Sequence, residues 1–129
     1  MQDLARKKHA LNTDVLKIML SNVAPVSTNA VKTDITEITA GFGYTAGGNV
    51  AAFVSDIDTS GTYKLILNPV TFTAAGGNIA QFQYAALYNS TAAALNLIGW
   101  YDYGVPIIVT NGNSFQVALD QTNGTFTLA

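Results

Sequence analysis

The sequence contains no cysteine and a single histidine, His9. Without cysteine there are no disulfides, no thiolate nucleophile and no thiolate metal site, so packing alone must stabilise the fold. A Ser-His-Asp arrangement would have to take its base from His9, near a chain end of the kind that is often poorly ordered. We therefore expect no enzymatic activity, no catalytic residues, no metal and no cofactor.

Charge is also scarce, because 11% of the residues are charged and 49% are hydrophobic, with a net charge of -2. An ordinary globular domain carries about 25% charged residues. The surface must therefore consist mostly of uncharged polar and small apolar groups, which suits contact with neighbouring proteins. The acidic balance argues against nucleic acid as a partner. No apolar run approaches the about 20 residues that cross a bilayer, so no membrane is expected either.

Basic residues are missing from the second half of the chain, where none follows Lys64. The segment 1–12 is different, and it carries four side chains of basic type: Arg6, Lys7, Lys8 and His9. Such a run is commonly a solvated, flexible end, but it also suits contact with an acidic partner surface. The sequence thus predicts an N-terminal arm over 1–12 and one domain over 13–129.

Short segments with alternating hydrophobicity fill most of the chain and predict β-strands. In "DVLKIMLS", Leu16, Ile18 and Leu20 fall on one side, which predicts a strand with one core face. Similar segments are "NVAAFVSDID", "GTYKLILN", "VTFT", "IAQFQYAALY", "AALNLIGWYDYG", "PIIVT", "SFQVALD" and "TFTLA". Only "NAVKTDITEIT" favours a short helix or turn. We expect an all-β fold, an antiparallel β-sandwich or a jelly-roll or barrel-like domain.

Two Asn-Gly pairs, Asn111-Gly112 and Asn123-Gly124, separate the last three predicted strands. Asn-Gly is a strong signal for a two-residue hairpin, because both residues tolerate positive φ. The pattern predicts that these three strands form an up-and-down meander.

The glycine-rich stretch "GFGYTAGGN" half matches a dinucleotide-binding fingerprint through Gly41, Gly43 and Ala46. That motif requires a helix after the glycines, whereas the next pattern here is a strand. We interpret the stretch as a loop that Phe42 and Tyr44 anchor to the body of the protein.

Two pairs of carboxylates raise the question of acid-base or calcium chemistry. Asp56 and Asp58 share one strand face, and Asp34 and Glu37 lie three residues apart. Neither pair has the further oxygen ligands of a calcium loop. The simpler interpretation is a cap at a strand end or a solvated pair.

Three aromatic rings surround one carboxylate in "LIGWYDYGV". Alternation predicts two faces of one strand, the first carrying Leu95, Leu97, Tyr101 and Tyr103, the second carrying Ile98, Trp100 and Asp102. The interpretation we favour makes one face core and the other a contact between subunits. Core packing alone, and a platform of Trp100, Tyr101 and Tyr103 that stacks on sugars, are the alternatives.

Beyond these patterns, the chain resembles a family of small virion structural proteins of tailed bacteriophages from about Thr13 to Ala129. The resemblance is carried by the succession "TDVLKIMLSNVAPV", "GYTAGGN", "SGTYKLILNPVTFTA", "QFQYAALYNSTA", "LIGWYDYG" and "NGNSFQVALDQTNGTFTLA". It implies a component of the virus particle and supplies no catalytic residues.

The resemblance implies a head decoration (cement) protein that binds and stabilises the capsid lattice. Its expected partners are the major capsid protein and further copies of itself, as a homotrimer by analogy. The protein would be made in the host cytoplasm and reside on the capsid exterior, with the arm on the acidic capsid surface. The alternative is a carbohydrate-binding or receptor-binding module on a tail or fibre.

Overall fold

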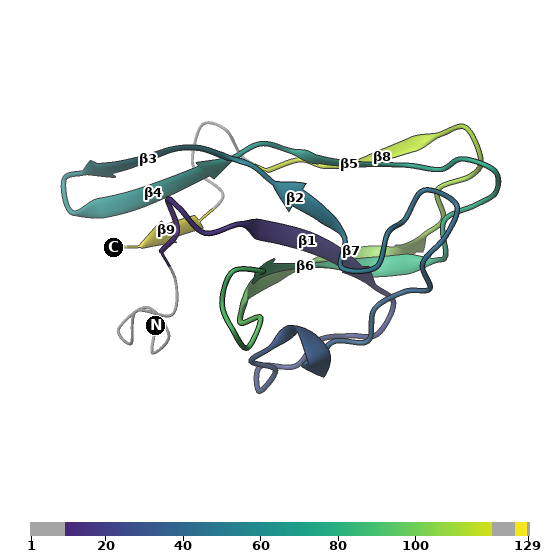
Figure 1. The fold of residues 1–129 in the computed structure, drawn as a ribbon, viewed down its shortest axis with the longest axis horizontal. Helices are drawn as coiled ribbons and strands as arrows, with labels where there is room; N and C mark the ends of the chain where they lie inside the picture. The colour runs from purple at the N-terminus through teal and green to yellow at the C-terminus, as the bar shows by residue number, and fades with distance from the viewer. Residues whose placement is uncertain (1–9, 120–125, 129) are drawn as a thin grey trace.

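The structure is a computed structural model that describes residues 10–119 and 126–128 (Figure 1). Within them, no helix is long and apolar enough to cross a membrane. The described helix is the three-residue 3-10 helix η1, Lys32–Asp34, which confirms the short helix or turn expected there. The strands are β1 Leu16–Ser21, β2 Asn49–Ala51, β3 Phe53–Thr59, β4 Thr62–Leu67, β5 Val70–Thr73, β6 Phe82–Asn89, β7 Leu97–Ile107, β8 Ser114–Val117 and β9 Phe126–Leu128. The all-β prediction is confirmed.

The strands form three antiparallel sheets that stack as a sandwich of two layers (Figure 1). One layer is the four-stranded sheet in the order β2-β1-β6-β7. The other holds β5-β8, which run above β1 and β6 in the figure, and β3-β4-β9, which extend to the left. Between the layers lies the interlayer core, which includes Leu16, Ile18, Leu20, Leu65, Leu67, Phe72, Phe82, Ala85, Leu87 and Val117. Burial of these alternating side chains is the main force that holds the layers together.

The four-stranded sheet is buried on its outer face as well. There Met19 of β1 and Tyr88 of β6 pack with Ile35 and Ala86 in a second group, the outer cluster. Part of the 22–48 connection covers this face through Ile35, with η1 beneath β6 in Figure 1. The expectation that β1 has one core face is therefore wrong, because a long connection without strands of its own supplies a second apolar cover.

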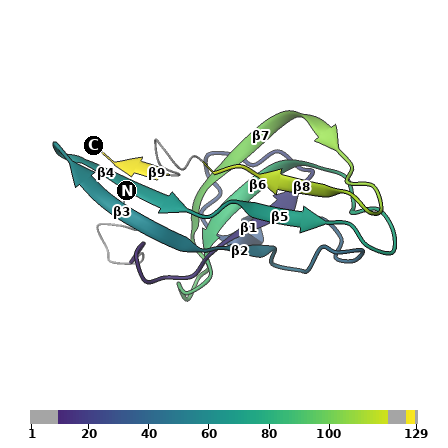
Figure 2. The same cartoon turned by 90° about the horizontal axis from the view of Figure 1, so that it is seen from above.

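The two layers are joined on one side and open on the other. β2 pairs with β1 in one layer, and its Asn49 side chain donates a hydrogen bond to the Thr71 carbonyl of β5 in the other, at 3.0 Å. On the opposite side β7 pairs with β6 alone and β8 with β5 alone, among the described residues. Figure 2 shows β7 and β8 as the outer strands there. The sandwich thus resembles a barrel with one open seam.

The predicted meander of the last three strands is wrong. Asn111 and Gly112 do form a tight turn, closed by the Asn113 N–H, which donates to the Thr110 carbonyl at 2.9 Å. However, the strand after the turn pairs with β5, the strand before it pairs with β6, and β9 pairs with β4. The Asn-Gly pair thus predicted the local turn correctly. Which strands pair is determined instead by the burial of side chains from segments that are distant in the sequence. Asn123-Gly124 lies outside the described residues.

Leu11 lies just before the predicted division at residue 12 and belongs to the folded domain. Its side chain is only 8% exposed and belongs to the interlayer core. A turn precedes β1, in which the N–H groups of Thr13 and Asp14 donate to the Ala10 carbonyl at 2.9 and 2.8 Å. Any truncation that leaves the core intact must therefore retain Leu11.

Glycines at two positions allow the 41–48 loop to lie directly on the strands. A Cβ on Gly48 would stand 1.8 Å from the carbonyl oxygen of Ile18, and one on Gly43 would stand 1.9 Å from that of Thr73. No side chain fits at these distances. Gly43, one of the glycines that half match a nucleotide fingerprint, thus serves close backbone packing against β5, and Gly48 serves close packing against β1.

We predict that Gly48→Ala lowers the free energy of unfolding by about 3 kcal/mol or more, because the methyl group collides with β1 backbone. Gly112→Ala is the matched control, since Gly112 also has a positive φ but its Cβ would meet nothing within 4 Å. It should lose only about 1 kcal/mol, the cost of the left-handed conformation. Urea denaturation of both variants measures the difference, and equal losses would contradict the close contact.

Candidate functional site

The aromatic residues of β7 lie on two opposite faces of the sheet. Trp100 is paired with Ala86 of the outer cluster, whereas Tyr101 is paired with Ala85 of the interlayer core. Directly opposed residues of antiparallel strands point to the same face. Tyr103 packs against the interlayer core as well. The predicted separation of Trp100 from the two tyrosines is therefore confirmed.

The predicted alternation fails at the start of β7. Leu95 and Leu97 pack against the outer cluster, on the side of Trp100, and Ile98 packs against the interlayer core. The cause is a register shift, since Leu97 is paired with Tyr88 but the next paired residue of β7 is Gly99. Ile98 is thus an extra residue, and a bulge of this kind moves every later side chain to the other face.

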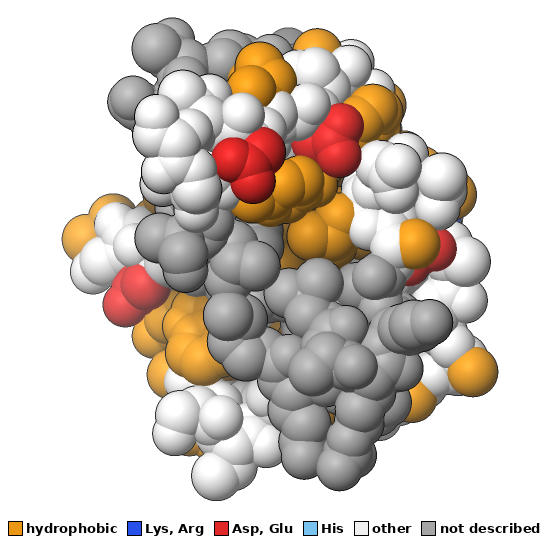
Figure 3. Space-filling view, turned by 90° about the vertical axis from the view of Figure 1, so that its left-hand side faces the viewer, with side chains coloured by type: hydrophobic (Ala, Val, Ile, Leu, Met, Phe, Trp, Pro, Cys, Tyr) orange, Lys and Arg blue, Asp and Glu red, His pale blue; other side chains and the backbone are white. Residues whose placement is uncertain are grey.

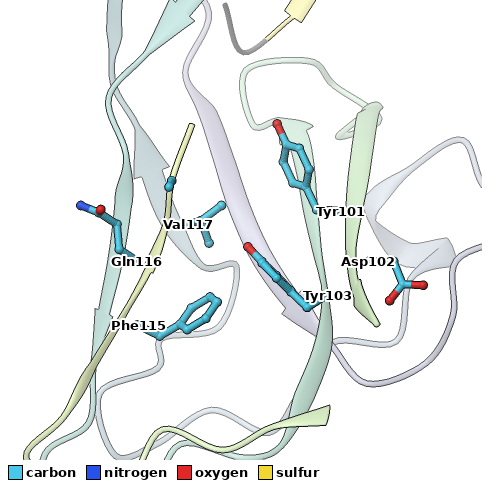
Figure 4. Close-up of a pocket in the computed structure, with 7 residues that line it drawn as sticks. Tyr101, Asp102, Tyr103, Phe115, Gln116 and Val117 are labelled. Carbon is cyan, nitrogen blue, oxygen red and sulfur yellow. The ribbon is translucent and has the colours of Figure 1, made fainter. Parts of the chain in front are cut away.

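A groove follows the open seam between β7 and β8 and is the main candidate for a binding site. It encloses about 330 Å³ and is lined by Tyr101, Asp102, Tyr103, Phe115, Gln116, Val117 and Ala118. In Figure 4, Tyr101 and Tyr103 point from β7 toward β8, and Phe115 and Val117 point back toward β7. Asp102 and Gln116 point away from the groove on both sides. The side chains that face it are therefore aromatic or apolar.

Ring contacts fix the floor of this groove. The ring centroid of Phe115 lies 5.2 Å from that of Tyr103 and 5.1 Å from that of Phe82, both edge to face. Burial raises the pKa values of Tyr101 and Tyr103 above their ordinary range. Both phenols therefore stay protonated near neutral pH and can donate a hydrogen bond. The groove can hold an uncharged group that combines an apolar part with an acceptor.

The sugar-stacking platform predicted from three aromatic residues is not formed. Trp100 is on the outer face of the sheet, on the opposite side from Tyr101 and Tyr103, so one sugar ring cannot contact all three. Trp100 is 39% exposed and Tyr101 is 38% exposed. The two faces thus present separate aromatic surfaces, one in the groove and one outside the sandwich.

The other two predicted aromatic residues, in the 41–48 loop, differ in burial. Tyr44 is fully buried, with its ring centroid 5.7 Å from that of Phe72 in the interlayer core. Phe42 is 57% exposed, and its ring lies against Gly77 in the loop after β5. Tyr44 therefore anchors the loop, as expected, whereas Phe42 covers a neighbouring loop at the surface.

A polar cluster around Glu37 joins the 22–48 connection to the sheet. The Glu37 carboxylate accepts hydrogen bonds from the Tyr44 hydroxyl at 2.6 Å and from the Gly47 N–H, and it pairs with Lys32 at 3.1 Å. The Tyr88 hydroxyl donates to the Gly47 carbonyl at 2.6 Å. Each member of the cluster therefore has a structural partner within the fold.

Opposing effects set the pKa of Glu37. Burial disfavours the carboxylate, but the hydrogen bonds from Tyr44 and Gly47 and the ion pair with Lys32 outweigh it and hold the pKa below its ordinary value. Burial, reinforced by the bond to Glu37, raises the pKa of Tyr44 far above its ordinary value. The pair is thus carboxylate and phenol at neutral pH, an arrangement that clamps the loop rather than transfers protons.

The other carboxylates singled out in the sequence do not converge. Asp34 accepts hydrogen bonds from the N–H groups of Ala30 and Val31, ahead of η1, which hold its pKa below the ordinary value. Asp58 accepts one from the Gly61 N–H in the turn after β3, at 3.2 Å. Asp56 accepts one from the Tyr63 hydroxyl at 3.4 Å. These are local caps and pairs, as the simpler interpretation of the sequence expected.

No group of three or more potential metal ligands occurs in the part of the chain that the structure describes. The predicted partner-contact residues Arg6, Lys7, Lys8 and His9 lie outside that part. Phe115 and Val117 were not identified from the sequence, although "SFQVALD" places them on one strand face. Their partner strand across the groove belongs to another layer, which periodicity alone does not reveal.

We predict that Glu37→Gln lowers the free energy of unfolding at neutral pH by about 2 kcal/mol, the worth of charged hydrogen bonds in a largely buried site. Because the folded pKa lies below the unfolded value of 4.5, this contribution is present above that pH and is lost as the pH falls through the folded pKa. The difference from the unmodified protein should therefore shrink toward about pH 3.

Urea denaturation at several pH values measures this effect, with Asp102→Asn as the control. Asp102 also has a lowered pKa, through hydrogen bonds from Gln83 and Gly104, but it is fully exposed to solvent. Its replacement should have much less effect. A Glu37→Gln deficit that is the same at acid and neutral pH would contradict the role of the charge.

Comparisons with protein-family models, with curated proteins and with solved structures gave no match to this chain. Among the described residues, the groove along the open seam and the exposed apolar residues on the edges of the sheets are candidate binding surfaces.

Proposed function

We propose that the protein is a virion structural protein of a tailed bacteriophage, a head decoration protein that binds and stabilises the capsid lattice. The observation that carries this proposal is a pair of edge strands, β3 and β7, that expose apolar side chains and contain no lysine or arginine. Natural edge strands are commonly guarded by charge, above all by lysine. Asp56 and Asp58 add acidic charge to β3, and Asp102 adds it to β7, but neither edge has a lysine or arginine beside its exposed apolar side chains. Such edges suit a protein that works in permanent contact with neighbours.

The two edges lie in different sheets and can serve different neighbours. β3 exposes Phe53, Val54 and Ile57 at the edge of the β3-β4-β9 sheet. Figure 3 shows hydrophobic and acidic side chains together on this end of the molecule. β7 exposes Trp100 and Val105 at the edge of the other layer. A lattice protein needs at least one surface for the shell and another for its own copies.

The resemblance of the sequence to virion proteins of tailed bacteriophages supplies the identity of the partners. On this proposal the protein binds the major capsid protein on the capsid exterior and associates with itself as a homotrimer. It is made in the host cytoplasm and acts without enzymatic activity or cofactor. The basic residues Arg6, Lys7, Lys8 and His9 contact the acidic capsid surface.

The alternative, a carbohydrate-binding or receptor-binding module of a tail or fibre, is less well supported. It depended on a single platform of Trp100, Tyr101 and Tyr103, and the sheet separates these residues onto two faces. In addition, the polar side chains beside the groove, Asp102 and Gln116, point away from it. Sugar recognition commonly combines stacking with several directed polar contacts. Among the residues that line this groove, the polar groups that face it are the hydroxyl groups of Tyr101 and Tyr103.

Particles produced without the protein should bind purified protein added back to them and then retain their DNA to a higher temperature. The physical reason is mass action, since a ligand that binds only the intact shell stabilises it. Co-sedimentation measures binding, and a dye that reports released DNA measures stability. An unrelated β-domain of similar size and charge is the control. Failure to co-sediment would contradict the proposed function.

The same particles test the N-terminal arm. Deletion of residues 1–9 should weaken attachment, and it retains Leu11 and so leaves the core complete. A full-length variant with Arg6, Lys7 and Lys8 replaced by glutamine separates charge from length. Its attachment should be weaker and less sensitive to salt than that of the unmodified protein. Unchanged occupancy by both variants would contradict the role of the arm.

The outer face of β7 is proposed as the contact within the homotrimer. Trp100→Ala should convert the trimer to monomers, because a central tryptophan commonly contributes about 2 kcal/mol or more to a contact. Val26→Ala, which changes an exposed residue of the 22–30 loop, should leave the trimer intact. Sedimentation equilibrium measures the mass. A Trp100→Ala variant that remains trimeric would place the contact elsewhere.

A further inference from the structure

We infer that the groove between β7 and β8 binds an extended segment of another protein, with an apolar side chain inserted between Tyr101 and Val117. The occupant is a polypeptide strand with apolar residues at alternate positions and a neutral or basic charge. On the proposed function this partner is the capsid subunit, and that identification alone rests on the proposed function.

The free strand edges on both sides of the groove indicate a polypeptide. Among the described residues, β7 is paired only with β6 and β8 only with β5, so each strand has one edge without a partner strand. Such an edge presents a row of N–H and C=O groups at the spacing of another strand. On β7 this row is regular from Gly99 to Asp102, before the irregular pairing between Asp102 and Ile107. Peptide segments are recognised in this way, with main-chain hydrogen bonds for affinity and pockets for alternate side chains.

The walls of the groove match an apolar side chain. Tyr101 and Tyr103 from one strand face Phe115 and Val117 from the other, across a space of about 330 Å³ (Figure 4). Within the described part of the chain, the hydroxyl groups of both tyrosines have no hydrogen-bond partner. They are therefore available to a carbonyl of the incoming segment. Contact of Phe115 with Tyr103 closes the floor, so the side chain enters beside Tyr101.

Charge favours a different protein over a second copy of this chain. Among the residues that line the groove, the charged one is Asp102, whose side chain lies at the rim and points outward. The sequence has no lysine or arginine after Lys64. The exposed edges of a second copy would bring Asp56 and Asp58 of β3, or its own Asp102, toward this carboxylate. Like charges at such a contact oppose pairing. A segment that is neutral or carries lysine or arginine avoids this repulsion.

Selection from a yeast-display library of random short peptides tests the inference without knowledge of the natural partner. The unmodified protein should enrich peptides with alternating apolar residues, few acidic residues and no proline at the positions that pair. Synthetic versions should shift the backbone amide signals of residues 101–103 and 115–118 in nuclear magnetic resonance spectra. Failure to enrich such peptides, or signal shifts confined to other regions, would overturn the inference.

Variants locate the binding in the groove. Tyr101→Ala should weaken binding of the selected peptides by about tenfold or more, as truncation of an aromatic anchor commonly does. Thr71→Ala is the control on the neighbouring strand β5, since this exposed side chain does not line the groove, and the affinity of this variant should be unchanged. Tyr101→Lys keeps an aliphatic stem over the floor and adds a charge that repels basic peptides. Equal affinity in all three variants would overturn the inference.

Self-association that Tyr101→Ala abolishes would show that a second copy fills the groove and would overturn the assignment to another protein. Binding of neutral oligosaccharides, but not of peptides, with the same amide shifts would likewise overturn it. If particles bind the unmodified protein and Tyr101→Ala equally while the peptide result holds, the groove serves a partner other than the capsid. If particles bind neither the unmodified protein nor Tyr101→Ala, the proposed function is wrong, and the assignment of the groove depends on the peptide result alone.

Discussion

Tyr44 is the point at which the parts of this fold meet. Its ring lies in the interlayer core against Phe72, while its hydroxyl accepts a hydrogen bond from the Leu20 N–H of β1 and donates one to Glu37. One side chain thus connects both layers of the sandwich to the connection that covers the outer face. A tyrosine with a buried body and a hydrogen-bonded tip is suited to this place, since an unpaired hydroxyl there would be costly. The glycines at 43 and 48 let the backbone approach closely enough for this contact.

The connection that Tyr44 anchors covers only part of the outer face of the four-stranded sheet, so side chains at the end of this sheet stay exposed. The outer cluster beneath residues 22–48 includes side chains of β1 and β6, whereas Trp100 of β7 is 39% exposed. On the inner side, the layers are joined at β2 but separate at β7 and β8. β7 is therefore incompletely covered on both of its faces. Because β7 is the last strand of its sheet, its outer face is open to the proposed trimer contact and its inner face lines the inferred peptide groove.

Sequence patterns predicted the strands and the class of fold well, because alternation records which side chains are buried. They failed where the partner of a segment was remote. Asn111-Gly112 forms the expected turn, but β8 pairs with β5 and not with the preceding strand. This pairing buries Val117 in the interlayer core. Leu97 and Ile98 exchanged faces at a bulge that no local pattern marks. The groove could not be predicted from local patterns either, because its walls come from strands of different layers.

The central claim is that the protein covers the capsid as a lattice-wide component, and its copy number tests this most directly. Quantitative peptide mass spectrometry on purified particles measures the ratio of this protein to the major capsid subunit. A decoration protein at every local three-fold position should be present at a ratio comparable to that of the capsid subunit. A ratio of only a few copies per particle would contradict this claim and would place the protein on the tail or at a single vertex.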